Sequence, residues 1–150
     1  MILIRAATTA DMPRMREIAS HAATAAQWGQ SEYAKLFAPE MHQNRLALVV
    51  EENSAVCGFI VARQVDCEWE IENIAVSGPA RRRGLGTRLL GEFIDEAKSR
   101  GGKTIYLEVR ESNLAARLLY GKSAFEEAGR RKAYYSDPDE DSVIFRLSLP

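Results

Sequence analysis

The sequence predicts one α/β domain, built from a mixed sheet with helices on its faces. Two observations lead to this class. In the second half of the chain, strand-like apolar runs alternate with amphipathic helical patterns in the order strand, helix, strand, helix, strand. In the first half, neighbouring runs rich in branched residues predict an antiparallel hairpin. The length of 150 residues suits a single core, and no repeat or linker divides residues 1–150.

The N-terminal elements are a short strand and a helix. Residues 2–6 are mainly apolar and predict the first strand. Thr8, Thr9 or Asp11 can cap a helix that ends near Ala23. That helix carries its apolar residues on one side, at Met12, Met15, Ile18 and Ala19. Residues 24–44 have an irregular pattern, in which we expect only a short helix from Ser31 to Phe37.

Three further strands are expected in the first half. Leu46–Val50 and Val56–Ala62 are joined by a short polar segment, as in a hairpin. The third run, Cys67–Val76, alternates apolar and polar residues but slips by one at Glu72-Asn73. Such a slip indicates a β-bulge, and an irregular strand end is the alternative.

The second half contains the most regular helix. From Gly84 to Arg100 apolar residues recur every three to four positions, and Gly101-Gly102 ends the pattern. Thr104–Val109 predicts a buried strand, and Asn113–Lys122 a helix with three leucines facing inward, namely Leu114, Leu118 and Leu119. The remaining elements are a strand near Arg130–Tyr135, an acidic turn at 137–141 and a final strand at Val143–Leu149.

Composition excludes several classes of protein. Twenty Lys plus Arg against 21 Asp plus Glu give no basic field of the kind that binds nucleic acid. No segment approaches the roughly 20 apolar residues of a membrane span. The apolar start is too short for a signal peptide, so we expect a cytoplasmic protein. Cys57 and Cys67 lie in strand-like segments and are expected to be buried structural thiols, and no metal spacing is present.

The loop before the regular helix could bind an anion. Its sequence runs from Ile74 to Thr87, through three arginines and two glycines, into the helix N-terminus. A helix N-terminus presents unpaired N–H groups, and glycine lets a phosphate approach the backbone closely. Leu89 replaces the third glycine of the dinucleotide fingerprint, and no Gly-Lys-Ser or Gly-Lys-Thr follows. The alternative is a solvated basic turn.

Several motifs in order resemble those of a known family. Arg81-x-x-Gly84-x-Gly86 follows the strand residues 72–76, and Leu107-Glu108-Val109-Arg110, Asn113 and Tyr120-x-x-x-x-Phe125 come after it. This arrangement, strongest from about Ile71 to Tyr135, resembles the GNAT N-acetyltransferase superfamily. The greatest likeness is to its RimI-like branch, bacterial enzymes that acetylate the N-terminal alanine of a small-subunit ribosomal protein.

The resemblance implies a fold, a co-substrate and a set of site residues. The GNAT fold has a largely antiparallel first half, splayed central strands and helices on both faces. Acetyl-CoA would be the co-substrate, and a protein or peptide N-terminus the acceptor. Glu108 would be the general base and Tyr120 the general acid. The residues implied to bind acetyl-CoA are Ile74, Ala75, Val76, Arg81, Arg82, Arg83, Gly84, Leu85, Gly86, Thr87 and Asn113.

Each implied role has an alternative that involves no catalysis. Glu108 could instead face solvent and pair with Arg110, two residues along the same strand face. Tyr120 could be a core residue, and Asn113 a helix cap. Aromatic residues that could line a peptide groove, or else pack in the core, are Trp28, Tyr33, Tyr134 and Tyr135. At the level of function, the rivals are acetylation of a lysine or a small-molecule amine, and a non-catalytic acyl-CoA-binding module.

Two positions depart from the family pattern. Ser77-Gly78-Pro79-Ala80 stands where relatives have an acidic or polar residue followed by Pro, so the entry to the loop could take another path. Ala124 stands where relatives have Gly before the Phe. If its backbone is left-handed, alanine costs on the order of 1 kcal/mol relative to glycine. Neither departure removes a group with an implied catalytic role.

Overall fold

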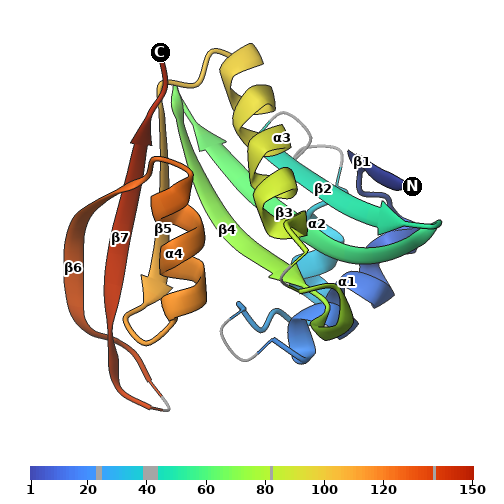
Figure 1. Ribbon diagram of the computed structural model, residues 1–150, viewed down its shortest axis with the longest axis horizontal. Helices are drawn as coiled ribbons and strands as arrows, with labels where there is room; N and C mark the ends of the chain where they lie inside the picture. The colour runs from blue at the N-terminus through green and yellow to red at the C-terminus, as the bar shows by residue number, and fades with distance from the viewer. Residues whose placement is uncertain (23–24, 39–43, 82, 137) are drawn as a thin grey trace.

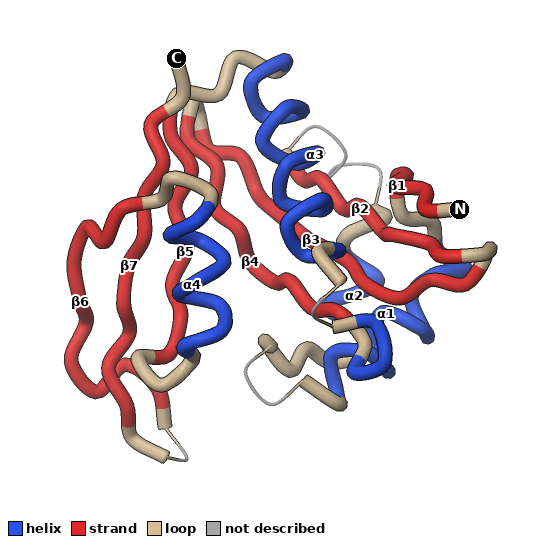
Figure 2. Tube along the Cα trace, in the orientation of Figure 1, coloured by secondary structure: helices blue, strands red, loops and turns tan. Residues whose placement is uncertain are grey.

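The computed structural model describes residues 1–150 apart from 23–24, 39–43, 82 and 137. The described residues form one seven-stranded sheet in the order β1-β2-β3-β4-β5-β7-β6, with helices on both faces (Figure 1). Neighbouring strands are antiparallel except β4 and β5, which run parallel. The expected mixed α/β fold is therefore confirmed, and Figure 2 shows its strands and helices along the chain.

The elements lie close to the segments expected from the sequence. The strands are β1 (Ile2–Ala6), β2 (Arg45–Glu52), β3 (Ala55–Val65), β4 (Glu68–Val76), β5 (Thr104–Arg110), β6 (Glu126–Tyr135) and β7 (Glu140–Ser148). The helices are α1 (Met12–Ser20), α2 (Gln30–Lys35), α3 (Leu85–Ser99) and α4 (Leu114–Lys122), with short 3-10 turns η1 (Thr9–Asp11) and η3 (Gly78–Ala80). α1 ends at Ser20, and Ala23, near which the end of this helix is expected, lies outside the described residues.

A separate core lies on each face of the sheet. α3 and α4 cover one face, and α1 and α2 cover the other (Figure 1). On the first face, Leu89 and Phe93 of α3 are completely buried with Trp69 of β4. On the second, Met15 and Ile18 of α1 belong to a smaller buried cluster. The expected apolar side of α1 thus faces the sheet.

The slip in the sequence pattern of β4 is a bulge. Val61 of β3 pairs with Asn73, whereas the next residue, Ala62, pairs with Ile71. Glu72 is therefore the extra residue on β4, which confirms the expectation of a bulge at Glu72-Asn73.

The sheet opens in its middle. β4 and β5 are paired only from Glu68 with Thr104 to Glu70 with Tyr106, and beyond this point the two strands diverge (Figure 1). Along the rest of β4, the edge turned toward β5 therefore has no strand partner among the described residues. Its backbone groups there need another partner, which a ligand could provide.

Two expectations about burial are wrong. Leu114 and Leu118 are exposed, at 64% and 63%, because Leu119 and the buried Tyr120 form the inward side of α4. Leu118 precedes Tyr120 by two residues and so points away from the core. Cys67 lies in the turn between β3 and β4 and is exposed, whereas Cys57 in β3 is buried as expected.

No helix in the described part of the chain is both long enough and apolar enough to cross a membrane. Within the same residues, no group of three or more His, Cys, Asp or Glu side chains is placed to hold a metal ion.

Candidate active site

A groove lies where β4 and β5 separate, on the face of the sheet opposite α3 and α4. Along β5, Ile105, Leu107 and Val109 are buried, while the alternate residues Tyr106 and Glu108 are partly exposed and face the groove. The groove has a volume of about 620 Å³. Its lining includes both sheet residues and aromatic side chains, among them Trp28, Tyr106, Glu108, Arg131, Tyr134 and Tyr135. We refer to this feature as the aromatic groove.

Glu108 is held by both of its carboxylate oxygens. Ser142 donates a hydrogen bond from Oγ to Oε2 at 2.7 Å, and Arg131 lies 3.2 Å from Oε1. The Glu108 side chain is 22% exposed, so it can still be reached from the groove. Glu108 is an internal residue of β5, but it lies just past the last residue of β5 that pairs with β4.

The alternative partner expected for Glu108 is wrong. The Arg110 guanidinium instead lies 3.3 Å from Glu140 and stacks over the ring of Tyr135, 4.6 Å from its centroid. The cation beside Glu108 comes from β6 and not from its own strand. Glu108 is therefore a groove residue with a counter-charge, rather than half of a solvated pair within β5.

Tyr120 lies on the opposite side of the sheet from Glu108. It is 2% exposed and packs against Phe125 and Phe145, with ring centroids 5.5 and 6.1 Å apart. Burial raises the pKa of its phenol far above the ordinary value of 10, because a phenolate would lose its hydration. The hydroxyl therefore remains protonated at neutral pH and has a proton that it could donate.

The expected diphosphate loop has the required backbone geometry. Gly84 is the N-cap of α3 and has a φ of +76°, a left-handed conformation that favours glycine. Gly86 lies in the first turn of α3, where a Cβ atom would come within 3.6 Å of Leu119. The 15-residue helix thus begins at a glycine-rich, exposed turn, with unpaired N–H groups and a positive dipole end. These features fit a bound diphosphate.

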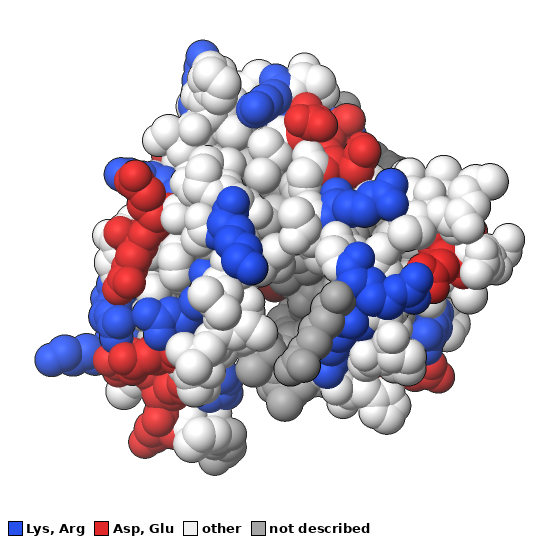
Figure 3. All heavy atoms as spheres, in the orientation of Figure 1, with Lys and Arg blue, Asp and Glu red and all other residues white. Residues whose placement is uncertain are grey.

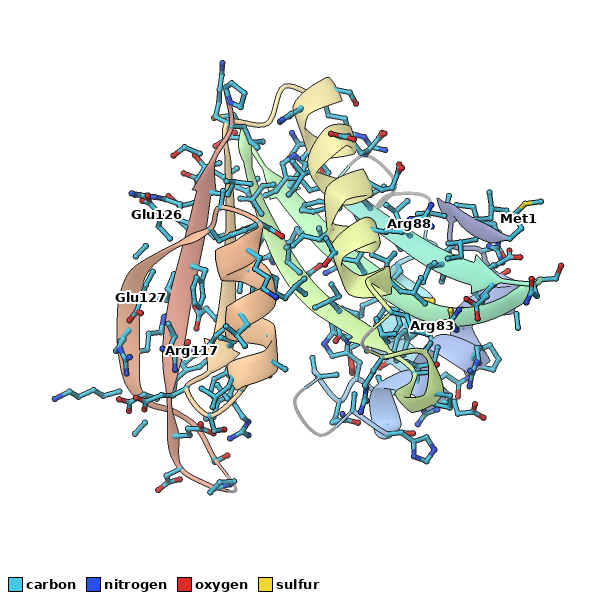
Figure 4. The ribbon with its side chains drawn as sticks, in the orientation of Figure 1. Met1, Arg83, Arg88, Arg117, Glu126 and Glu127 are labelled. Atoms are coloured by element: carbon cyan, nitrogen blue, oxygen red, sulfur yellow. The ribbon has the colours of Figure 1, made fainter. Side chains whose placement is uncertain are left out.

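Two of the three arginines of this loop, Arg81 and Arg83, bind other groups of the protein. Arg81 donates to the carbonyl oxygens of Val76 and His21 at 3.0 and 3.4 Å, and Arg83 forms an ion pair with Glu52. Arg82 lies outside the described residues. Lys and Arg side chains nevertheless gather around the N-terminal half of α3 (Figures 3 and 4), so the local charge remains favourable for an anion.

The other expected acetyl-CoA residues occupy β4 and the start of α4. Ile74, Ala75 and Val76 are the last residues of β4, along the part that has diverged from β5. Asn113 is the N-cap of α4, and its Oδ1 accepts a 3.1 Å hydrogen bond from the N–H of Ala116. The cap interpretation is confirmed. Because the bond uses the acceptor oxygen, the side-chain NH₂ is the group that could donate to a ligand.

The loop departure at 77–80 is accommodated without strain. Ser77 is the N-cap of the short turn η3, and Pro79 occupies an early position of that turn, where its missing N–H has no cost. Ala124 has a φ of +70°, so the condition stated for this position is met.

The sequence did not single out Asn73 for a structural role. Its side chain is buried and bonds the backbone of Ala26 twice: the N–H of Ala26 donates to Oδ1 at 3.2 Å, and Nδ2 donates to the carbonyl oxygen at 3.1 Å. This pair fixes the segment that carries Trp28 against the bulge of β4. Among the aromatic candidates, Trp28 lines the groove, whereas Tyr33 is 1% exposed and belongs to the core.

The groove lining also includes three glutamates of β4, which are Glu68, Glu70 and Glu72. Glu72, the bulged residue of β4, lies 3.2 Å from Arg45, and burial raises the pKa of its carboxyl group. Because its side chain is only 13% exposed and is held by this arginine, it is less accessible than Glu108. Its raised pKa nevertheless makes Glu72 the carboxylate to compare with Glu108 as a base.

Comparisons with known proteins give a consistent result. A model of the acetyltransferase (GNAT) family matches residues 12–125. The ribosomal protein bS18-alanine N-acetyltransferase of Escherichia coli strain K12 is 36% identical, over 99% of both chains. A crystal structure of the ribosomal-protein-S18-alanine N-acetyltransferase from Escherichia coli has a TM-score of 0.87 and 33% identity, covering 99% of this chain and 94% of that one.

One further solved structure shows a likeness in fold alone. The structure of a Salmonella typhimurium protein with its cofactor acetyl-CoA has a TM-score of 0.86 and 23% identity, covering 100% of this chain and 95% of that one.

Proposed function

We propose, from the premise that this chain belongs to the acetyltransferase (GNAT) family, that its acceptor is the N-terminal alanine amine of a ribosomal protein. The chain is an N-acetyltransferase that uses acetyl-CoA. The observation that carries the proposal is the groove carboxylate of Glu108 beside the opening between β4 and β5, with the protonated phenol of Tyr120 on the other side of the sheet. The full-length relative named for this acceptor supports the choice of amine.

The acceptor amine must lose a proton before it can attack a carbonyl carbon. An α-amino group has a pKa of roughly 7.7–8.0, against roughly 10.4 for a lysine side chain. In our proposal, Glu108 accepts that proton, directly or through a water molecule. An N-terminal amine suits this carboxylate better than a lysine, because less free energy is needed to deprotonate it.

The leaving group must gain a proton. When bound, acetyl-CoA supplies an acetyl group activated as a thioester. We assign the proton donation to Tyr120, whose phenol is kept neutral by burial. Since the acetyl group passes directly to the amine, neither cysteine is needed as a nucleophile.

The acetyl-CoA site that we propose uses mainly backbone groups. The diverged edge of β4 at Ile74–Val76 would hold the pantetheine arm, and the first turn of α3 would hold the diphosphate, from residue 82 to Thr87. Arg81 would shape the loop, and the side-chain NH₂ of Asn113 would donate near the thiol end. With a ribosomal protein as acceptor, the enzyme would work in the cytoplasm.

The acceptor is tested with matched peptides. Coenzyme A release and mass spectrometry would be measured on an alanine-starting ribosomal peptide, and on the same peptide blocked at its N-terminus but containing lysine. We expect acetylation of the free N-terminus alone. Acetylation of the blocked peptide on lysine would contradict the proposed acceptor, and acetyl-CoA binding without transfer to any amine would contradict the proposed catalysis.

The catalytic assignments are tested by conservative substitutions. Glu108→Gln and Tyr120→Phe should each lower kcat by about 10²–10⁴-fold, the usual contribution of general acid–base catalysis, and leave the KM for acetyl-CoA nearly unchanged. Glu72→Gln is the matched control within the same groove. A larger loss of kcat in Glu72→Gln than in Glu108→Gln would contradict the assignment of Glu108 and would indicate that Glu72 is the base.

A further inference from the structure

We propose that Ser142 is a positioning residue, which fixes the rotamer of Glu108 so that one carboxylate oxygen faces the acceptor amine. This inference rests on the proposed role of Glu108 as the base. It assigns to a residue of β7 a function that its sequence, Asp141-Ser142-Val143, gives no reason to expect.

Three neighbouring strands, β5, β7 and β6, bring the side chains of Glu108, Ser142 and Arg131 together on one face of the sheet. Ser142 pairs with Arg110 of β5 on one side and with Arg131 of β6 on the other. Glu108 pairs with Ile144, so Ser142 is its diagonal neighbour on the same face of the sheet. Glu108, Ser142 and Arg131 therefore meet through the register of the sheet.

The two groups that hold Glu108 differ in their accessibility. Ser142 is 0% exposed, and its hydroxyl donates to Oε2 at 2.7 Å, a short distance typical of a bond to a charged acceptor. The Arg131 side chain is 56% exposed, and its contact with Oε1 is longer, at 3.2 Å. An incoming ammonium group can displace the exposed arginine from Oε1, but it cannot reach the buried serine.

The two carboxylate oxygens of Glu108 therefore have different roles. Ser142 keeps Oε2 in place on the inner side of the groove, and Oε1 is left for exchange between Arg131 and the acceptor. The ring of Tyr135 lines the groove near the Glu108 carboxylate. Burial and then the charge of Glu108 raise the pKa of its phenol, so it stays neutral beside the carboxylate. A carboxylate without the Ser142 bond would sample other rotamers and would accept the proton less often.

The test is a double-mutant cycle measured by coenzyme A release. Ser142→Ala should lower kcat about tenfold, the fold-change expected for losing a hydrogen bond to a charged group, with the KM for acetyl-CoA unchanged. In a Glu108→Gln background, the same substitution should lower kcat no further. The matched control is Ser148→Ala, an exposed serine near the other end of β7, which should leave kcat unchanged.

Each result distinguishes the positioning role from a structural one. A loss of kcat in Ser142→Ala that is equally large in both backgrounds would overturn the inference, since Ser142 would then act on the fold rather than through Glu108. Wild-type kcat in Ser142→Ala with an inactive Glu108→Gln would overturn the inference and leave the proposed function intact. Wild-type kcat in Glu108→Gln would overturn the inference together with the proposed role of Glu108 as the base.

Discussion

Ala124 has a left-handed backbone conformation at the C-terminus of α4, with a φ of +70°. The N–H of Phe125 donates to the carbonyl oxygen of Tyr120 at 3.0 Å, and the N–H of Ala124 donates to that of Gly121 at 3.2 Å. These are the two hydrogen bonds of a Schellman motif, in which glycine is the usual residue at the left-handed position. The rings of Tyr120 and Phe125 supply the accompanying apolar contact.

The Ala124→Gly substitution should therefore stabilise the protein. A left-handed conformation costs an L-residue roughly 1–2 kcal/mol, which glycine avoids. Glycine also gains freedom in the unfolded chain, which offsets roughly 0.4–1 kcal/mol of this benefit. The net stabilisation is about 0.5–1 kcal/mol, which corresponds to a rise of roughly 1–4 °C in the unfolding midpoint of a domain of this size.

Thermal unfolding followed by circular dichroism would measure this effect. The matched control is Ala115→Gly, an exposed position in the first turn of the same helix, where the backbone is right-handed and glycine should cost up to about 1 kcal/mol. The same substitution should thus have opposite signs at two positions of one chain. A lower midpoint for Ala124→Gly, equal to that of Ala115→Gly, would refute the reasoning. Because glycine preserves the Schellman motif, which positions Tyr120, kcat should not change in Ala124→Gly.

Three other predictions follow from the structure. Asn73→Ala leaves the backbone of Ala26 without its side-chain partner, so it should cost about 1–3 kcal/mol in denaturant unfolding and raise the KM of the acceptor peptide more than that of acetyl-CoA. Asp11 has its pKa held below the ordinary 3.8 by its bond with Arg5, so its stabilising effect is complete above about pH 4 and is lost as the pH falls further. Midpoints measured from about pH 5 down to about pH 3 should therefore fall less steeply for Asp11→Asn than for the wild type. In the native protein, a thiol reagent should modify the exposed Cys67 quickly and Cys57 slowly, because burial raises the pKa of the Cys57 thiol; equal rates would contradict the assigned burial.

The regular elements could be predicted because their causes are local. The apolar spacing of α3 and the glycines that flank it lie within one short segment, and the bulge at Glu72-Asn73 leaves a visible slip in alternation. The left-handed position of Ala124 likewise follows from the end of a helix. Such signals need no knowledge of distant residues.

Burial around α4 could not be predicted in the same way. Its leucines lie on two sides of a nine-residue helix, and the sequence pattern does not say which side faces the sheet. The structure places Tyr120 inward, and this choice exposes Leu114 and Leu118. Cys67 was assigned to a strand but falls in a turn, since strand ends are set by the pairing of β3 with β4.

The sequence by itself determined the fold class and the glycine loop at the start of α3, and it pointed to Glu108 and Tyr120, for which we propose the acid–base roles. Only the tertiary structure decided how Glu108 is held. Ser142 is 34 positions away along the chain, and Arg131 comes from a third strand. The register of β5, β7 and β6 brings them together, and the divergence of β4 from β5 opens the groove beside them. Both depend on pairing between distant segments, which the local pattern of a single sequence does not reveal.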